Sequence, residues 1–236
     1  MKDREIAYRR FPTLVFDERE PFLPSRVAYS IFREPCDSNV DPRRRLGTKN
    51  RIVFALPGLD SVVEYGIWWD WDIQHLYELE AAWAYLGEGG EYLKLEASWH
   101  GRYNVMYEDP ADFKGGRPVL YSQPGKHAFA SDPAGFPREV TRNACSRDAG
   151  RMGLHVTPLF EGKIAKSPRR DRLASRYLQG KSFVPNFKFS RNWLPSPGQI
   201  VTWEDMKAWI PSRIEEVISL LEGRDVDACD DHRPRD

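Results

Sequence analysis

The chain has 236 residues, and its 35 Lys and Arg balance 35 Asp and Glu, so the formal net charge is zero. This balance argues against a nucleic-acid binder driven by a global positive field. Aromatic residues make up 13% of the sequence, which supplies enough apolar area to argue against intrinsic disorder. Three scattered cysteines exclude a small disulfide-built protein and indicate unpaired thiols in a reducing, cytoplasmic compartment.

Neither a signal peptide nor a membrane span is predicted. The first ten residues are charged and lack an apolar core, unlike a secretory leader. No apolar run approaches the roughly 18 residues that a membrane helix needs. The oligomeric state is left open by the sequence.

Short apolar and aromatic runs separated by Pro and Gly predict strands along the first half of the chain. The predicted strands cover residues 11–16, 27–32, 51–56, 61–72, 83–86, 92–99 and 118–122. Gly89-Gly90 predicts a hairpin turn, and Pro124-Gly125 predicts a second tight turn. Residues 36–50, with the basic run Arg43 to Arg45, are typical of a solvated loop.

The second half of the chain has weaker periodicity. Residues 131–200 are interpreted as a loop-rich extension with a strand or two. Thr202 and Asp205 indicate a helix start, and apolar residues at helical spacing continue to Gly223. We therefore expect a mainly β fold: one domain over residues 1–236, with a β-sandwich core over 10–130, the extension, and a C-terminal helix over 202–223.

Residues 64–80 combine acids with an aromatic background. The segment contains no Lys or Arg, and its ionisable residues are Glu64, Asp70, Asp72, His75, Glu78 and Glu80. Carboxylates in apolar surroundings are costly to bury unless they are paired. These groups must therefore face water or be neutralised by something cationic.

Strand geometry brings several of these acids together. On antiparallel strands, Glu78 and Glu80 share one face, and Asp70 and Asp72 share a face of the preceding strand, with His75 on the turn. Such clusters suit Mg²⁺, Ca²⁺ or Mn²⁺. A solvated acidic rim is the alternative. Residues 72–86 also fit a helical stripe, in which His75 and Glu78 would share a face.

Other residues are candidates for proton transfer and substrate binding. His100 follows a predicted strand and His127 follows a tight turn, whereas His155 and His232 have no such context. The aromatic residues that can line a cavity and stack on a sugar or ring are Trp68, Trp69, Trp71, Trp99 and Tyr103, with core packing as the alternative role. Lys126, beside His127, is a candidate substrate-binding residue.

Three segments, in order, resemble a known pattern. They are His75-Leu-Tyr-Glu78-Leu-Glu80, Trp99-His100-Gly101 and Arg117-Pro-Val-Leu-Tyr-Ser-Gln-Pro-Gly-Lys-His127-Ala128. The necrosis- and ethylene-inducing-peptide-like proteins carry Gly-His-Arg-His-Asp-Trp-Glu, and the related vacuolar-protein-sorting-like proteins carry His-Glu-Gly-Asp-Trp-Glu. Over residues 10–130 the chain is similar to this superfamily, although Leu79 replaces the motif's Trp and Glu78 its Asp.

The resemblance implies a β-sandwich with a divalent cation in an acidic surface cavity. Matched position by position, the residues around that cation would be His75, Glu78, Glu80, Asp70 (with Asp72 as the alternative), His100 and His127. His100 and His127 would reach the metal directly or through water. The resemblance also favours a strand after Glu78.

Together these patterns predict a divalent-metal-dependent enzyme of hydrolase or lyase type, acting on a sugar or a phosphorylated small molecule. His75, His100 and His127 are its candidate catalytic residues. The alternative is a metal-dependent protein that binds a glycan or lipid headgroup without catalysis, and a third possibility is a purely structural ion. An enzyme should have a deep cavity with a histidine not bound to the ion, whereas a binding module should expose its ion.

Overall fold

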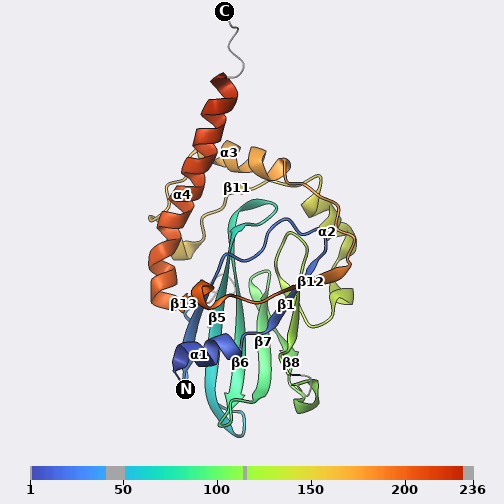
Figure 1. Cartoon of the computed structure of the whole chain (residues 1–236), viewed down its shortest axis with the longest axis vertical. Coiled ribbons are helices and arrows are strands. Elements are labelled where there is room, and N and C mark those ends of the chain that lie inside the picture. Colours follow the sequence, from blue (N-terminus) through green and yellow to red (C-terminus); the bar gives the residue numbers. More distant parts are fainter. Residues whose placement is uncertain (1, 41–50, 114–115, 231–236) are drawn as a thin grey trace, which may run out of the picture.

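The structure is a computed structural model, and it describes residues 2–40, 51–113 and 116–230 (Figure 1). The basic run Arg43 to Arg45 lies outside the described residues. The described part is mainly β with four α-helices, which confirms the predicted fold class, including the C-terminal helix.

The larger sheet has seven strands. Six follow the order β13-β2-β5-β6-β7-β8, and β11 pairs with β6 beside β7. Their bounds are β2 (Arg26–Phe32), β5 (Leu59–Trp71), β6 (His75–Gly87), β7 (Tyr92–Trp99), β8 (Arg102–Tyr107), β11 (Gly153–Leu154) and β13 (Ile200–Thr202).

The smaller sheet has four strands in the order β10-β9-β1-β12. Their bounds are β1 (Thr13–Asp17), β9 (Val119–Ser122), β10 (Phe129–Ala130) and β12 (Phe189–Trp193). A separate two-stranded pair joins β3 (Cys36–Asp37) to β4 (Arg51–Ile52). The strand predicted over 51–56 is thus two residues long, and Val53 beyond it is exposed.

The α-helices are α1 (Asp3–Arg9), α2 (Arg138–Cys145), α3 (Pro168–Gln179) and α4 (Trp203–Asp230). Short 3₁₀ helices are η2 (Pro110–Phe113), η3 (Pro133–Gly135), η4 (Pro158–Phe160) and η5 (Pro197–Gln199). Figure 1 shows α4 along one side of the larger sheet, with its C-terminal turns projecting past α3. Thr202 caps α4 by accepting the Asp205 N–H, as predicted, but the helix continues past Gly223.

Two apolar clusters cover the two faces of β5 and β6. One joins Leu14 and Phe16 of the smaller sheet to Ile67 and Trp69 of the larger, as expected for a sandwich. The other packs Trp68 and neighbouring side chains against α4, whose buried face includes Met206, Ile210, Ile214, Val217 and Ile218. The central strands are therefore buried on both faces, and neither can show the alternating pattern of a half-exposed strand.

Residues 75–86 lie in strand β6 after a turn at 72–74, although the composition of 72–86 also favours a helix. Register pairs between β5 and β6 run from Leu59 with Gly87 to Trp71 with Leu76. Ala81, Ala82 and Ala84 are buried, which suits a strand pressed between two layers. Tertiary pairing thus outweighs local helix propensity here.

The predicted loop-rich extension contains more regular structure than expected. It holds α2 and α3, and it supplies β11 to the larger sheet and β12 to the smaller. Helix α3 begins where Ser167 accepts the Arg170 N–H and Pro168 occupies the first turn. Its buried face is small, because Leu173, Ala174 and Leu178 stand in an arginine-rich background that hides the periodicity.

Within the described residues, no helix combines the length and the apolar composition that crossing a membrane requires.

Candidate functional site

Three of the predicted residues meet where β5 turns into β6. Asp72 donates its backbone N–H to the His75 carbonyl, and its Oδ1 accepts the Gln74 N–H at 2.7 Å. This tight turn places His75 Nε2 3.7 Å from Asp72 Oδ1 and 3.6 Å from Glu78 Oε2. One candidate ligand atom from each of Asp72, His75 and Glu78 lies within 4.8 Å of the others.

The orientation of His75 is fixed by its other ring nitrogen. Nδ1 lies 2.8 Å from the Tyr77 carbonyl oxygen. A carbonyl only accepts, so Nδ1 carries the hydrogen, and in the neutral ring Nε2 presents a lone pair to two carboxylate oxygens. A metal ion placed between these three acceptor atoms would be bound by all of them. A backbone carbonyl on the far nitrogen is also the usual support of a metal-binding histidine.

Tyr77 has a left-handed backbone with φ of 56°, which costs a non-glycine residue about 1 kcal/mol or more. The left-handed residue brings its own carbonyl onto the His75 ring. Its phenol stacks on Trp68 at 4.8 Å between ring centroids, which helps to hold that conformation. The strained backbone of Tyr77 therefore helps to orient the His75 ring.

A turn between β9 and β10 places Lys126 beside this cluster. Gly125 has φ of +67°, and a Cβ there would come within 2.8 Å of both Cys145 Sγ and Ile73 Cγ2, so only glycine fits. The Gly125 carbonyl accepts the Ile73 N–H at 2.8 Å. This hydrogen bond ties the turn that carries Lys126 to the turn that carries Asp72.

Lys126 supplies the local cation that the sequence segment lacks. Its Nζ donates to both oxygens of the fully buried Asp72 at 2.7 Å. Burial by itself raises the pKa of Asp72, but the charges of Lys126 and His75 outweigh it and hold that pKa below its usual value. Burial likewise lowers the pKa of Lys126, and the charges of Asp72 and Glu78 more than offset it, so the ammonium form is stabilised.

This ion pair also limits how the cluster can bind a metal. Asp72 Oδ1 already accepts hydrogen bonds from Gln74 and Lys126. An oxygen has two lone pairs, so a metal ion at Oδ1 must displace one of these two donors. The cluster thus fits a divalent ion in its donor atoms, with Lys126 as a competing cation built into the chain.

Glu80 lies next to the cluster but in a different electrostatic state. It is buried, and the Ser98 hydroxyl hydrogen-bonds to its Oε2. Burial and then the nearby charge of Glu78 hold the pKa of Glu80 well above its usual value. A carboxyl group must lose its proton to bind a metal ion, so the raised pKa disfavours Glu80 as a ligand.

The cluster opens onto a cavity of about 730 Å³. Asp72 lies behind its wall, and the cavity is lined by Ser38, Asn39, Val40, His75, Glu78, Leu79, Glu80, His100, Gly101, Lys126, Met152, His155, Thr157, Leu159, Lys163, Trp203 and Lys207. Three of these are histidines and three are lysines. The sequence singled out His75, Glu78, Glu80, His100 and Lys126 of this set.

A gap in the larger sheet creates the opening. On one edge, β6 pairs with β11 at His75 and Leu76 and with β7 from Ala82 onward. Between these two stretches, residues 77–81 of β6 pair with no described strand on this edge. Side chains satisfy two backbone groups there, because Glu78 accepts the Leu79 N–H and Ser98 accepts the Ala81 N–H. The gap lets a ligand approach the strand that carries Glu78 and Glu80.

His100 reaches the cavity from a tight hairpin. Trp99 pairs with Arg102, and the two residues between them, His100 and Gly101, have φ of 46° and 78°, which gives a type I′ turn. His100 Nε2 lies 2.6 Å from Gln123 Oε1, whose amide nitrogen in turn donates to Thr141. With Nε2–H donated to Gln123, Nδ1 of the neutral ring keeps a lone pair for proton transfer.

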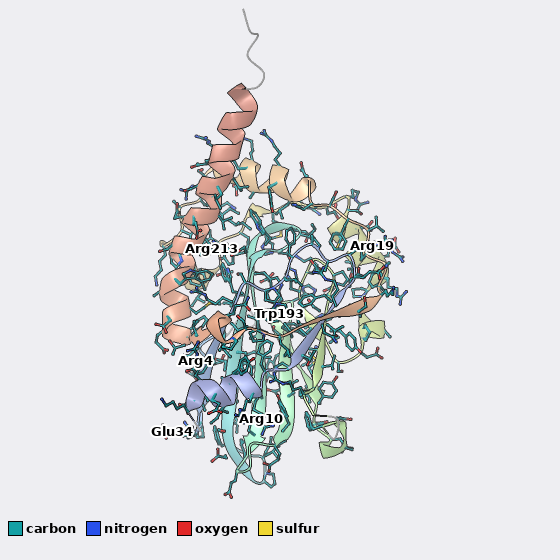
Figure 2. The ribbon with its side chains drawn as sticks, viewed as in Figure 1. Arg4, Arg10, Arg19, Glu34, Trp193 and Arg213 are labelled. Atoms are coloured by element: carbon teal, nitrogen blue, oxygen red, sulfur yellow. The ribbon has the colours of Figure 1, made fainter. Side chains whose placement is uncertain are left out.

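The structure does not bring Asp70 into this group. Asp70 lies on the opposite face of β5 from Trp69, toward α4, where Arg213 donates to its two oxygens at 3.1 and 2.8 Å. Trp68 Nε1 donates to the same carboxylate at 3.0 Å. Arg213 stands on α4 alongside the sheet (Figure 2). The predicted ligand Asp70 therefore forms an ion pair that joins α4 to the sheet.

His127 does not line the cavity either. It is fully buried, and its ring stacks on Trp69 at 4.6 Å with an interplanar angle of 8°. Neither ring nitrogen has a hydrogen-bond partner within the described chain. The Glu20 carboxylate lies close to the ring, with its Oε1 3.6 Å from Nε2. Its surroundings are those of a core residue beneath the turn that carries Lys126.

The aromatic residues predicted to line the cavity pack elsewhere. Trp69 is buried between the sheets, and Trp71 contacts Tyr177 at 4.3 Å between ring centroids. Trp99 stacks on Phe136 at 5.8 Å. Tyr103 lines a separate cavity of about 220 Å³. Trp203 is the tryptophan that contributes to the larger cavity, and it comes from the first residue of α4.

Sequence reasoning missed His155, Lys163 and Lys207, which also line the cavity. The His155 ring lies 5.4 Å from the His75 ring, between centroids. The first two residues stand in the extension and the third on α4, so no spacing pattern links them to residues 70–80. Tertiary contacts bring the extension to this site, among them the pairing of β11 with β6 and the Met152 N–H donated to the Gln74 carbonyl.

Comparisons with known proteins add no relative: no family model, no curated protein and no solved structure matches the chain. The resemblance drawn from the sequence motifs therefore stays a prediction.

Proposed function

We propose that the chain is a divalent-metal-dependent enzyme of hydrolase or lyase type that acts in the cavity beside β6. The observation that carries this proposal is His75, whose Nδ1–H is held by a backbone carbonyl while Nε2 faces carboxylate oxygens of Asp72 and Glu78. This donor set joins one imidazole to two carboxylates, and among Mg²⁺, Ca²⁺ and Mn²⁺ it suits Mn²⁺ best. A cytoplasmic location, inferred from the cysteines, belongs to the same proposal.

A bound ion would polarise a substrate oxygen or activate a water molecule. The chain's own residues supply the remaining functions. His100 lines the cavity, and with Nε2–H donated to Gln123 its Nδ1 can accept or return a proton. Glu80 on the cavity wall has a pKa raised by burial, so its carboxyl group is a second candidate for proton transfer. Lys126, when displaced from Asp72, can stabilise negative charge that develops on the substrate.

The alternative, a binding protein without catalysis, is disfavoured by the cavity. His75 and Glu78 of the cluster line a cavity of about 730 Å³, and His100 lines that cavity outside the three-residue cluster. A module that only binds a headgroup needs neither a proton-transfer histidine nor a buried carboxylic acid.

Mn²⁺ titration by isothermal titration calorimetry tests the proposal. Glu78→Gln should weaken Mn²⁺ binding by about tenfold or more, because it removes a charged ligand. Lys126→Met should strengthen it by about tenfold, because it removes the competing ammonium. Glu88→Gln, in the exposed β6–β7 turn, changes the same charge away from the cavity and is the matched control.

Absence of Mn²⁺ binding in the wild-type protein would refute the metal site. To separate an enzyme from a binding protein, turnover of phosphate esters and glycosides should be compared in the wild type and His100→Asn. Asparagine suits the type I′ turn, so this variant should fold and bind Mn²⁺ but lose turnover. Mn²⁺ binding without turnover of any substrate tested would favour the binding protein.

A further inference from the structure

The mouth of the cavity carries two lysines that have no acidic partner among the described residues. Lys163 follows η4, and Lys207 lies in the second turn of α4. Both are exposed, and neither side chain has an ion pair or hydrogen bond to another described residue. Lys126, the third cavity lysine, is tied to Asp72. Lys163 and Lys207 are therefore available to a ligand.

Other basic residues near the cavity are paired. Lys166, three residues after Lys163, lies 3.4 Å from Asp171, and Arg170 donates to Glu215 at 2.7–2.8 Å. Arg213, on the same helix as Lys207, is paired with Asp70. The lack of an acid partner thus distinguishes the two lysines at the cavity mouth from these neighbours.

The electrostatic surroundings favour an anion at this position. Residues 138–181, which contribute Met152, His155 and Lys163 to the cavity, contain eleven Lys or Arg and four Asp or Glu. This local excess of positive charge exists although the whole chain is neutral. A field of one sign at a cavity mouth concentrates ligands of the opposite sign.

The rest of the wall suits a small organic molecule. Trp203, Leu79 and Leu159 supply apolar surface, and Thr157 and Asn39 add polar groups. A bare inorganic ion would leave this apolar surface unused. The mixture is typical of sites that fix an organic ligand with a few polar groups.

We infer that the ligand of this cavity is a small organic molecule bearing a phosphate or carboxylate group, which Lys163 and Lys207 bind at the mouth. The remainder of the molecule would then reach toward His75 and Glu78. The inference deepens the proposed function, since it names the substrate class of the same cavity, but the contact with the two lysines needs no metal ion.

The test uses metal-free full-length protein, prepared with a chelator and then desalted. Inorganic phosphate and, separately, acetate are titrated at constant ionic strength and followed by amide chemical-shift changes in NMR spectra. The Lys163→Met/Lys207→Met double variant should bind the preferred anion about tenfold or more weakly than the wild type. The anion that binds the wild type more tightly identifies the group that the lysines recognise.

Lys181→Met is the matched control. It removes one exposed positive charge from the same basic segment, outside the cavity lining, and should change anion affinity by less than about twofold. Lys163 and Lys207 are exposed, so the double variant should keep the melting temperature of the wild type. Circular dichroism measures that temperature.

Equal anion affinity in the wild type and the double variant would overturn the inference, as would the absence of binding by both anions. The two proposals fail separately. Anion binding without Mn²⁺ binding would refute the metal site and leave the anion site, whereas Mn²⁺ binding without anion binding would refute the anion site alone.

Discussion

Asp70 and Asp72 stand two residues apart at the end of β5, and each is paired with a basic side chain, yet their surroundings differ. Asp70 faces α4, where Arg213 and Trp68 donate to its oxygens. Asp72 lies behind the cavity wall, where Lys126 donates to its carboxylate. His75 and Glu78 each place a candidate ligand atom within 4.8 Å of it. The Arg213–Asp70 pair joins a helix to a sheet. The Lys126–Asp72 pair instead lies beside His75 and Glu78, whose facing atoms are both acceptors.

The difference shows why an acidic segment cannot be interpreted as one unit. Glu64, on the α4 face like Asp70, is satisfied by Trp83 Nε1 and the Asn39 N–H. Acids on this face therefore hold packed elements together. At the β5–β6 turn, His75 Nε2 instead faces oxygens of Asp72 and Glu78, and this group of acceptors can bind a cation in competition with Lys126.

The largest effect is expected from Asp72→Ala. This variant leaves the Lys126 ammonium buried without its partner, which should lower the free energy of unfolding by about 3 kcal/mol. It also removes a candidate metal ligand. Urea denaturation measures the first effect and calorimetric titration with Mn²⁺ the second. Adding Lys126→Met should recover part of the lost stability, and an equally unstable double variant would show that the pair is not the cause.

Arg213→Met should have a smaller effect, confined to stability. Asp70 would lose its charged partner but keep the Trp68 hydrogen bond, and the Arg213 side chain is already partly exposed. We expect a loss of about 1–3 kcal/mol in urea denaturation. Mn²⁺ affinity should stay within about twofold of the wild type. A large change in Mn²⁺ affinity would contradict the separation of the two acids.

The smallest effect concerns Glu64 and pH. Burial raises the pKa of Glu64 above its ordinary 4.5. Above pH 4.5 the unfolded chain releases a proton that the folded protein still holds, so this group makes the protein less stable as the pH rises toward its folded pKa. Glu64→Gln removes that contribution. Unfolding free energies of wild type and variant, measured from about pH 5 to about pH 8, should therefore diverge, and parallel curves would contradict this assignment.

Several features could be read from the sequence because they depend on local patterns. The buried stripe of α4, from Ile210 to Leu221, follows from helical spacing, and the Thr202 cap from side-chain chemistry. The meeting of Asp72, His75 and Glu78 follows from a hairpin of adjacent strands. Helix α3 was missed, although Ser167 and Pro168 mark its start, because its apolar face has only three buried residues.

The sequence alone determined that the chain is globular, mainly β, and locally acidic around residues 64–80. Tertiary structure decided which acids are neutralised, because Arg213 lies 143 residues from Asp70 and Lys126 lies 54 from Asp72. It also decided that the tryptophans pack in the core while His155, Lys163 and Lys207 line the cavity. Charge pairing and cavities depend on distance in space, whereas a single sequence reveals only spacing along the chain.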